Sequence, residues 1–290
     1  MHINVKEFLV SPGHKVKLKH WPTEVKPFYD SRKECDEKLE RHVARLSEMQ
    51  GRLYADARHA ALIIFQAMDA GGKDGAIKHV MSGVNPQGCQ VFSFKAPSAE
   101  ELAHDFLWRT TRYLPPRGHI GIFNRSYYEE TLVVRVHPEL LEKQRLPERF
   151  CRDPRIWKHR YHSINEYEKH LTRNGTKIVK IFLHLSREEQ RRRLLKRIEQ
   201  PEKNWKISLD DIRERERWNG YVEAYQDCLE ATSTPEAPWY CVPADVKPNA
   251  WLIVSQIITD ALKALKIPPP GSVPGQRREL QKMRRLLMKS

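Results

Sequence analysis

Five short apolar segments alternate with stretches of helical periodicity, and this alternation restricts the possible folds more than any other feature. The predicted strands are Ala61–Phe65, Cys89–Phe94, His119–Phe123, Lys177–Leu185 and Trp239–Val242. Short apolar strands separated by helices typically form a parallel sheet covered on both faces, with ligands bound beyond the carboxyl ends of the strands. The sequence therefore predicts an α/β fold with three layers and a parallel sheet of about five strands.

The rest of the chain divides into one domain with two flanking segments. Apolar residues at helical spacing predict long helices over residues 31–55, 156–171 and 208–231. The run PPPGSVPG breaks this periodicity and is followed by a basic amphipathic sequence. The predicted parts are an N-terminal arm over residues 1–30, a domain over 31–267 and a basic tail over 268–290.

The formal net charge of +14 calls for an anionic partner. Nucleic acid, an acidic membrane surface and a phosphate-rich substrate all satisfy this requirement, and charge alone does not choose among them. No apolar run approaches the roughly 18 residues of a membrane span, and the first residues lack the pattern of a signal peptide. We therefore expect a soluble cytoplasmic protein without a membrane partner.

Cysteine and histidine do not form a recognisable metal-binding pattern. The five cysteines are widely scattered and never occur as C-x-x-C, so we expect reduced thiols. His159 and His162 could share a helix face, but no cysteine or carboxylate cluster accompanies them.

A glycine-containing loop joins the first predicted strand to a helix within residues 60–81, AALIIFQAMDAGGKDGAIKHVM. Such a loop can turn its backbone amides toward an anion, and the following helix adds the positive end of its dipole. Lys73 would supply a further positive charge. The residues predicted to form this phosphate-binding loop are Ala70, Gly71, Gly72 and Gly75.

The loop departs twice from the usual pattern G-x-x-x-x-G-K-[ST]. Ala67 stands in place of the first glycine, and Asp74 replaces the hydroxyl residue that normally reaches Mg²⁺. A glycine-rich turn with a solvated Lys73 is therefore the alternative to a phosphate site.

Polar residues follow the third predicted strand in HIGIFNRSYYEE. Arg125 comes directly after Asn124, and Glu129 and Glu130 lie about one helical turn further on. An arginine beside carboxylates suits phosphoryl transfer, because the cation neutralises developing charge and the carboxylates hold metal or acceptor. A solvated ion pair at the start of a helix is the alternative.

A basic run in REEQRRRLLKR is predicted to lie on a helix of a lid over about residues 186–220. Arg191, Arg192 and Arg193 would close over phosphates there, whereas an ordinary solvated face is the alternative. Other basic residues could form a track for a long anion. They are Lys78, Lys95, Arg109, Arg112 and Arg135.

These segments together resemble the polyphosphate kinase type 2 family. The resemblance is carried by AMDAGGKDGAIKHVMSGVNPQG, IGIFNRSYYEETLVVRVHP, RRRLLKRIEQPEKNWKISLDDI and ATSTPEAPWYCVPADVKPNA. It implies a P-loop kinase fold related to thymidylate kinase. It also implies phosphoryl transfer between inorganic polyphosphate and a nucleotide, with Mg²⁺ as the cofactor or Mn²⁺ in its place.

The resemblance also implies roles for individual residues. Asp69, Lys73 and Asp74 match the phosphate-loop signature of the family, and Asn124 and Arg125 match its second motif, so these five are the expected catalytic residues. Asp69 is the expected ligand of Mg²⁺ or orients the attacking phosphate.

The second motif, with LVVRVHP after it, is similar to that of members that accept nucleoside mono- and diphosphates. The expected reaction is reversible transfer from polyphosphate to AMP and ADP, or to GMP and GDP, in a homo-oligomer (dimer or tetramer) that binds no nucleic acid. Glu129 and Glu130, together with the basic residues of the track and the lid, would bind nucleotide or polyphosphate.

Two other functions remain open at this point. An ATP-dependent nucleotide kinase of thymidylate kinase-like fold would use a similar loop and lid, but would be expected to keep the first loop glycine and a Ser or Thr after the lysine. A basic nucleic-acid-binding protein without enzymatic activity would also explain the charge, although the chain lacks an RNP motif or a zinc finger.

Overall fold

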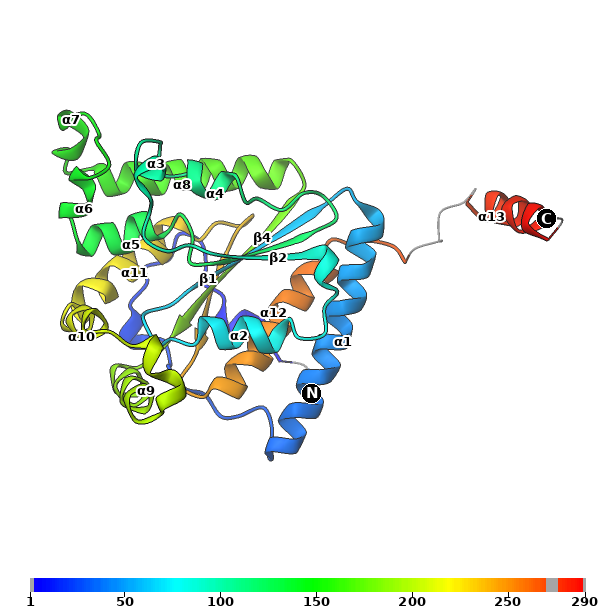
Figure 1. The fold of residues 1–290 in the computed structure, drawn as a ribbon, viewed down its shortest axis with the longest axis horizontal. Helices are drawn as coiled ribbons and strands as arrows, with labels where there is room; N and C mark the ends of the chain where they lie inside the picture. The colour runs from blue at the N-terminus through cyan, green and yellow to red at the C-terminus, as the bar shows by residue number, and fades with distance from the viewer. Residues whose placement is uncertain (1–2, 270–275, 289–290) are drawn as a thin grey trace.

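A five-stranded sheet forms the centre of the computed structural model, which describes residues 3–269 and 276–288. All strand pairs are parallel, and the order is β2-β3-β1-β4-β5 (Figure 1). The strands are β1 (Ala60–Gln66), β2 (Cys89–Ser93), β3 (Ile120–Asn124), β4 (Thr176–His184) and β5 (Trp239–Pro243). The prediction of a three-layer α/β fold with five parallel strands is confirmed.

The central position of β1 follows from its sequence. All seven of its residues are buried, and Ile63 lies in register with Ile122 of β3 and Val179 of β4. A strand that is buried on both faces is stable only between other strands and beneath helices, which explains its unbroken apolar run. The loop after β1 therefore emerges at the middle of the carboxyl edge of the sheet.

Thirteen α-helices lie within the described ranges, several of them a single turn long. They are α1 (Arg32–Asp56), α2 (Lys73–Val80), α3 (Ala99–Leu102), α4 (Trp108–Thr111), α5 (Glu129–Val136), α6 (Glu139–Glu142), α7 (Glu148–Cys151), α8 (Ile156–Arg173), α9 (Arg187–Glu199), α10 (Leu209–Glu216), α11 (Trp218–Thr232), α12 (Lys247–Lys263) and α13 (Gln276–Leu287). Short 3₁₀ helices are η1 (Val5–Phe8), η2 (Leu18–His20), η3 (Pro86–Gly88) and η4 (Pro201–Lys206).

Helices cover both faces of the sheet (Figure 1). On one face α1, α2 and α12 contribute to one apolar core, and on the other α5, α8 and α11 contribute to a second. α1 starts where the side chain of Ser31 accepts a hydrogen bond from the backbone of Glu34, and it buries Leu46 and Leu53 completely. These caps and apolar stripes account for the layers.

The prediction of one continuous helix over 208–231 is wrong. The segment forms α10 and α11, with a break at Arg217. α10 starts at a capping box between Ser208 and Asp211, and it ends where the Arg217 amide donates to the carbonyl of Glu214. This tighter bond interrupts the α-helical ladder, so the chain can change direction before α11 begins.

Residues before α1 lie against β5 and α11. The Val10 amide donates to the carbonyl of Trp239 at 2.9 Å, and the Leu18 amide donates to the side chain of Gln226 at 2.9 Å. At the other end of the chain, part of the predicted basic tail, residues 270–275 and 289–290, lies outside the described residues. None of the described helices is both long and apolar enough to span a bilayer.

Candidate active site

The loop between β1 and α2 is held by its own backbone and by one lysine. Lys73, the first residue of α2, donates from Nζ to the carbonyl of Ala67 at 2.8 Å. The Gly71 amide donates to the carbonyl of Met68 at 3.0 Å. Gly72 is the residue before the helix and has a φ of +98°, a conformation that strongly favours glycine.

Close packing between Ala67 and Gly71 explains one unusual pairing in the loop. A Cβ atom at position 71 would lie 2.5 Å from the Cβ of Ala67 and 2.8 Å from the carbonyl oxygen of Met68. Because Ala67 occupies the space where the usual pattern has a glycine, position 71 has no room for a side chain. The alanine at position 67 and the glycine at position 71 are therefore coupled.

The loop meets the end of β3 through two polar contacts. Arg125 donates from Nη2 to Oδ1 of Asp69 at 3.1 Å, and its Nη1 lies 3.8 Å from a carboxylate oxygen of Glu129. Asn124 donates from Nδ2 to Oδ1 of Asp74 at 2.7 Å. The structure therefore brings the five predicted catalytic residues together at the carboxyl edge of the sheet.

Burial and neighbouring charges at this edge shift the pKa of two groups. Burial, and to a lesser extent the nearby charge of Arg125, lowers the pKa of Lys73 to about 8, and the charge of Asp69 opposes this shift. Burial raises the pKa of Glu129, and the charges of Arg125 and Lys73 oppose that shift. A cation that titrates near neutral pH thus lies beneath the loop.

A cleft of about 790 Å³ opens over the loop. Nine lysine and arginine side chains line it, against three aspartates, so its walls are strongly positive. The cations are Lys73, Lys95, Arg125, Arg193, Lys196, Arg197, Lys203, Lys206 and Lys247, and the aspartates are Asp69, Asp74 and Asp211. Such a surface suits a ligand that carries many negative charges.

A second, smaller cavity of about 150 Å³ adjoins the cleft. The two share Asp69 and Arg125. Flat or apolar side chains predominate in the lining of the second cavity: Met68, Leu132, Val133, Trp218, Tyr221 and Tyr225. A positively charged cleft and an aromatic cavity therefore meet at one carboxylate and one arginine, and this meeting point is called the junction below.

The three arginines predicted for the lid occupy different environments on α9. Arg193 is buried and donates from Nη1 to the carbonyl of Ala70 at 3.0 Å, with Nη2 directed at the carbonyls of Ala244 and Asp245. Arg191 and Arg192 are exposed, pair with glutamates of their own helix and do not line the cleft. Arg193 thus connects the lid helix, the loop and the end of β5.

Several other predicted binding residues lie away from the cleft. Arg109 is buried and donates to the carbonyl of Lys95, and Arg112 lies over the ring of Trp108. Glu130 is buried and paired with Arg160. The remaining two are Lys78, exposed on α2, and Arg135, which contacts Tyr161 and Asp227.

Sequence reasoning missed residues on both sides of the junction. Lys203, Lys206 and Lys247 line the cleft, although the first two follow the predicted basic helix and the third opens α12. Tyr221 and Tyr225 line the smaller cavity from α11. The spacing of these tyrosines by four residues, following Trp218, signals an aromatic face on one helix, and this signal could have been noticed.

Two aspartates of the cleft fit a magnesium ion. Mg²⁺ typically takes one or two protein carboxylates and completes its shell with water and substrate phosphates. Asp69 and Asp74 both line the cleft, on either side of Lys73. No group of three histidine, cysteine, aspartate or glutamate side chains that could hold a metal occurs among the described residues, so these aspartates would share the ion with a substrate.

Comparison with known proteins agrees with this geometry. A sequence model of the family described as Polyphosphate kinase 2 (PPK2) matches residues 29–269. The chain belongs to the polyphosphate kinase 2 family. It is 57% identical over 289 residues to the "ADP-polyphosphate phosphotransferase" of Rhodopseudomonas palustris, with 100% of each chain covered. It is 41% identical over 267 residues to the "AMP/ADP-polyphosphate phosphotransferase" of Meiothermus ruber, covering 92% of this chain and 96% of that protein.

A solved structure of the same family has the same fold. The crystal structure of polyphosphate kinase 2 from Arthrobacter aurescens TC1 superimposes with a TM-score of 0.81 at 38% identity, covering 92% of this chain and 93% of that one. These relatives support the resemblance drawn from the sequence. They support neither an ATP-dependent nucleotide kinase nor a nucleic-acid-binding protein.

Proposed function

We propose that this protein transfers the terminal phosphoryl group of inorganic polyphosphate to ADP and to AMP, in a reversible reaction that requires Mg²⁺. Family membership makes the chain a polyphosphate-dependent nucleotide kinase. One observation carries the finer assignment: a cation-lined cleft and an aromatic cavity meet at Asp69 and Arg125. Donor and acceptor would react at that junction.

The donor chain would lie in the cleft. Each phosphate of the polymer brings negative charge, and the nine cations of the walls would compensate it over several phosphates. Lys73 and the loop amides would hold the terminal phosphoryl group. Lys203, Lys206 and Lys247 would bind phosphates farther along the chain.

The acceptor nucleotide would lie in the aromatic cavity. Trp218 and Tyr221 offer flat surfaces for a nucleobase, and Arg125 would attract the terminal phosphate of the nucleotide toward the junction. An acceptor held in this way would reach the end of the donor chain across Asp69.

In the reaction, a terminal phosphate oxygen of the nucleotide attacks the end phosphorus of polyphosphate. A new P–O bond forms as the bridging P–O bond to the chain breaks, and the polymer leaves one phosphate shorter. Positioning and charge neutralisation by Lys73 and Arg125 supply the catalysis, because the nucleophile is already ionised at neutral pH. Magnesium, held by Asp69 and Asp74, would neutralise further charge on the phosphate oxygens.

Acceptance of AMP as well as ADP is the more specific part of the proposal. It is supported by the second motif, Asn124 to Glu130, and by the Meiothermus ruber relative, whose name includes both nucleotides. The Rhodopseudomonas palustris relative is named for ADP alone. The two acceptors therefore need separate assays.

The test supplies purified protein with Mg²⁺ and polyphosphate, adds AMP or ADP without ATP, and separates the nucleotides by chromatography. We expect ADP to give ATP, and AMP to give ADP and then ATP. The Lys73→Ala variant should lose at least about 100-fold in turnover, as is typical for removal of a preorganised charge. Consumption of ADP alone would exclude the AMP assignment, and no reaction with either acceptor would exclude the proposal.

Assembly and location are also part of the proposal. A homo-oligomer, either a dimer or a tetramer, is expected in the cytoplasm, with no nucleic acid or membrane bound. Sedimentation analysis of the purified protein, with and without polyphosphate, would measure its oligomeric state.

A further inference from the structure

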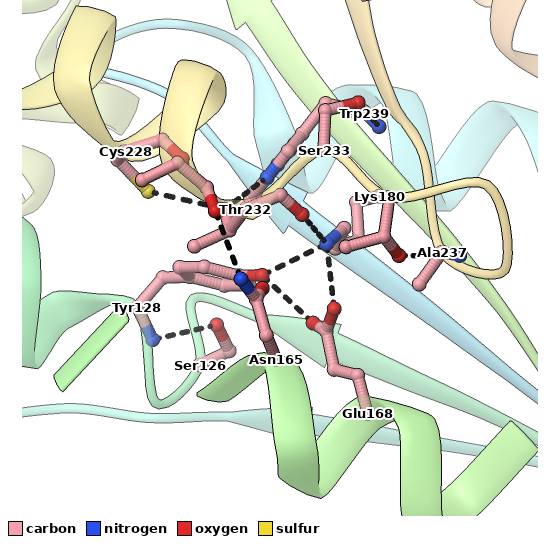
Figure 2. Close-up of polar contacts among 12 residues, drawn as sticks. Ser126, Tyr128, Asn165, Glu168, Lys180, Cys228, Thr232, Ser233, Ala237 and Trp239 are labelled. Atoms are coloured by element: carbon pink, nitrogen blue, oxygen red, sulfur yellow. Dashed lines mark hydrogen bonds and ion pairs between the residues drawn. The ribbon is translucent and has the colours of Figure 1, made fainter. Parts of the chain in front are cut away.

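A buried ion pair lies beneath the sheet, away from both cavities. Lys180 of β4 and Glu168 of α8 are 0% and 1% exposed, and Lys180 donates from Nζ to Oε2 of Glu168 at 2.6 Å (Figure 2). The ammonium also donates to the hydroxyl of Tyr128 at 2.9 Å and to the carbonyl of Thr232 at 2.6 Å. All three of its donors therefore have partners.

The carboxylate of this pair holds two consecutive tyrosines. The hydroxyls of Tyr127 and Tyr128 each donate to Oε1 of Glu168 at 2.8 Å, and both side chains are fully buried. Trp239 extends the same network by donating from Nε1 to the hydroxyl of Thr232 at 2.9 Å. The network thus links β4, β5, α8 and α11 to the segment just before α5.

That segment begins at Arg125, whose backbone is strained. Its φ is +64°, in the left-handed region that is unfavourable for a residue with a side chain. Its amide donates to the carbonyl of Phe65 at 3.0 Å, while its guanidinium points back to Asp69. A strained residue of this kind persists only where its neighbours fix the backbone on either side.

Ser126 connects the network to β1, the strand that precedes the phosphate-binding loop. Its hydroxyl accepts hydrogen bonds from the Tyr128 amide at 3.1 Å and from the side chain of Gln66, at the end of β1, at 3.2 Å. Residues 126–128 are therefore attached to the sheet through Gln66 and through the buried pair. The turn at Arg125 lies between these attachments and the end of β3.

We propose that Glu168 and Lys180 act as positioning residues, which hold Tyr127 and Tyr128 so that Arg125 keeps the backbone geometry needed to reach the junction of the two cavities. The inference rests on the proposed function, because it assigns the pair a role in the reaction that Arg125 serves. It also gives a reason for a fully buried pair of charges, where a pair of apolar residues is often at least as stable.

A purely structural role predicts different behaviour from a positioning role. A structural pair would change the melting temperature without changing the turnover of protein that remains folded. A positioning pair would change turnover through Arg125, and its effect would vanish once the guanidinium is removed. A double-mutant cycle separates the two cases.

The cycle compares the parent, Tyr128→Phe, Arg125→Ala and the double variant, at a temperature where all four are folded. We expect Tyr128→Phe to lower kcat by between about tenfold and about a hundredfold, the scale of a small misplacement of a catalytic group. In the Arg125→Ala background the same change should cost less than about twofold. The inference would be overturned if the losses of the two single variants simply multiply in the double variant. It would also be overturned if Tyr128→Phe keeps the parental kcat, or if Arg125→Ala keeps the parental activity.

Two further variants separate stability from position. Glu168→Met combined with Lys180→Met removes both charges but leaves the Tyr127 and Tyr128 hydroxyls and the Thr232 carbonyl without partners, so we expect a lower melting temperature. In protein that remains folded, we expect a kcat below that of the parent. Leu46→Ala, in the apolar core on the other face of the sheet, should lower the melting temperature and keep the parental kcat below it. A parental kcat in the folded double methionine variant would show that the pair is structural only, and would overturn the inference.

These results are distinguishable from failure of the proposed function. If the parent transfers no phosphoryl group from polyphosphate, the proposed function fails before the cycle begins. If the parent is active and the losses multiply independently, only the positioning role fails.

Discussion

At the scale of residues, Ala67 and Gly71 form a coupled pair. Gly71→Ala should lower turnover by roughly tenfold or more, because its Cβ would enter space that Ala67 occupies. Adding Ala67→Gly should restore part of the activity, although the close contact with the carbonyl of Met68 remains. Steady-state kinetics on the two single variants and the double variant checks this, and strictly multiplicative effects would contradict the coupling.

Lys73 is expected to give the enzyme an alkaline limit. Its pKa of about 8 means that the ammonium loses its proton, and the loop its cation, as pH rises through that value. The ratio kcat/KM for polyphosphate should therefore fall above about pH 8, whereas kcat should fall only at higher pH because bound phosphate stabilises the charged form. The guanidinium of Lys73→Arg stays protonated. Whatever activity this variant retains should therefore not show the fall in kcat/KM above about pH 8. If kcat/KM of Lys73→Arg falls in the same pH range, the group that titrates is not Lys73.

At the scale of elements, α9 contributes Arg193, Lys196 and Arg197 to the cleft and not its whole basic surface, and of these three described residues only Arg193 bonds to the loop. Arg193→Ala would leave the carbonyls of Ala70 and Ala244 without a donor, so both melting temperature and turnover should fall. Lysine should rescue only partly, because it lacks the forked geometry. Arg191→Ala and Arg192→Ala, matched by helix and charge, should keep turnover within about twofold. Equal losses in all three variants would instead support the predicted arginine lid.

The elements were largely predictable, because strands buried on both faces leave continuous apolar runs and helices leave caps. The loop residues and Asn124–Arg125 were predictable for a related reason: each directly follows a strand at the same edge of the sheet. The distinct position of Arg193 could not be predicted, since Arg191 and Arg192 beside it are also arginines. Only tertiary packing distinguishes the three. The break at Arg217 was not predicted either, since neither a proline nor a glycine marks it in the sequence.

Lys180 illustrates a further limit of the sequence. It stands within an apolar run, where a lone lysine gives no sign of its partner, and Glu168 lies on a different element. Pairing of this kind depends on the register of β4 against its covering helices. The positioning network therefore became visible only in three dimensions.

At the scale of the whole molecule, the net charge of +14 has a local counterpart in the cleft. Nine cations face three aspartates there, while the adjoining cavity is lined mainly by aromatic and aliphatic groups. This division predicts that the two substrates respond to different parts of the surface. The cleft should set the affinity for polyphosphate, and the cavity the affinity for nucleotide.

The most direct test measures initial rates over a grid of polyphosphate and ADP concentrations for the parent, Lys247→Ala and Trp218→Leu. We predict that Lys247→Ala raises KM for polyphosphate several-fold, more at low salt than at high salt, and leaves KM for ADP unchanged. Trp218→Leu should raise KM for ADP and leave KM for polyphosphate unchanged. A rise in KM for ADP in the cleft variant, or for polyphosphate in the cavity variant, would contradict the assignment of the two substrates.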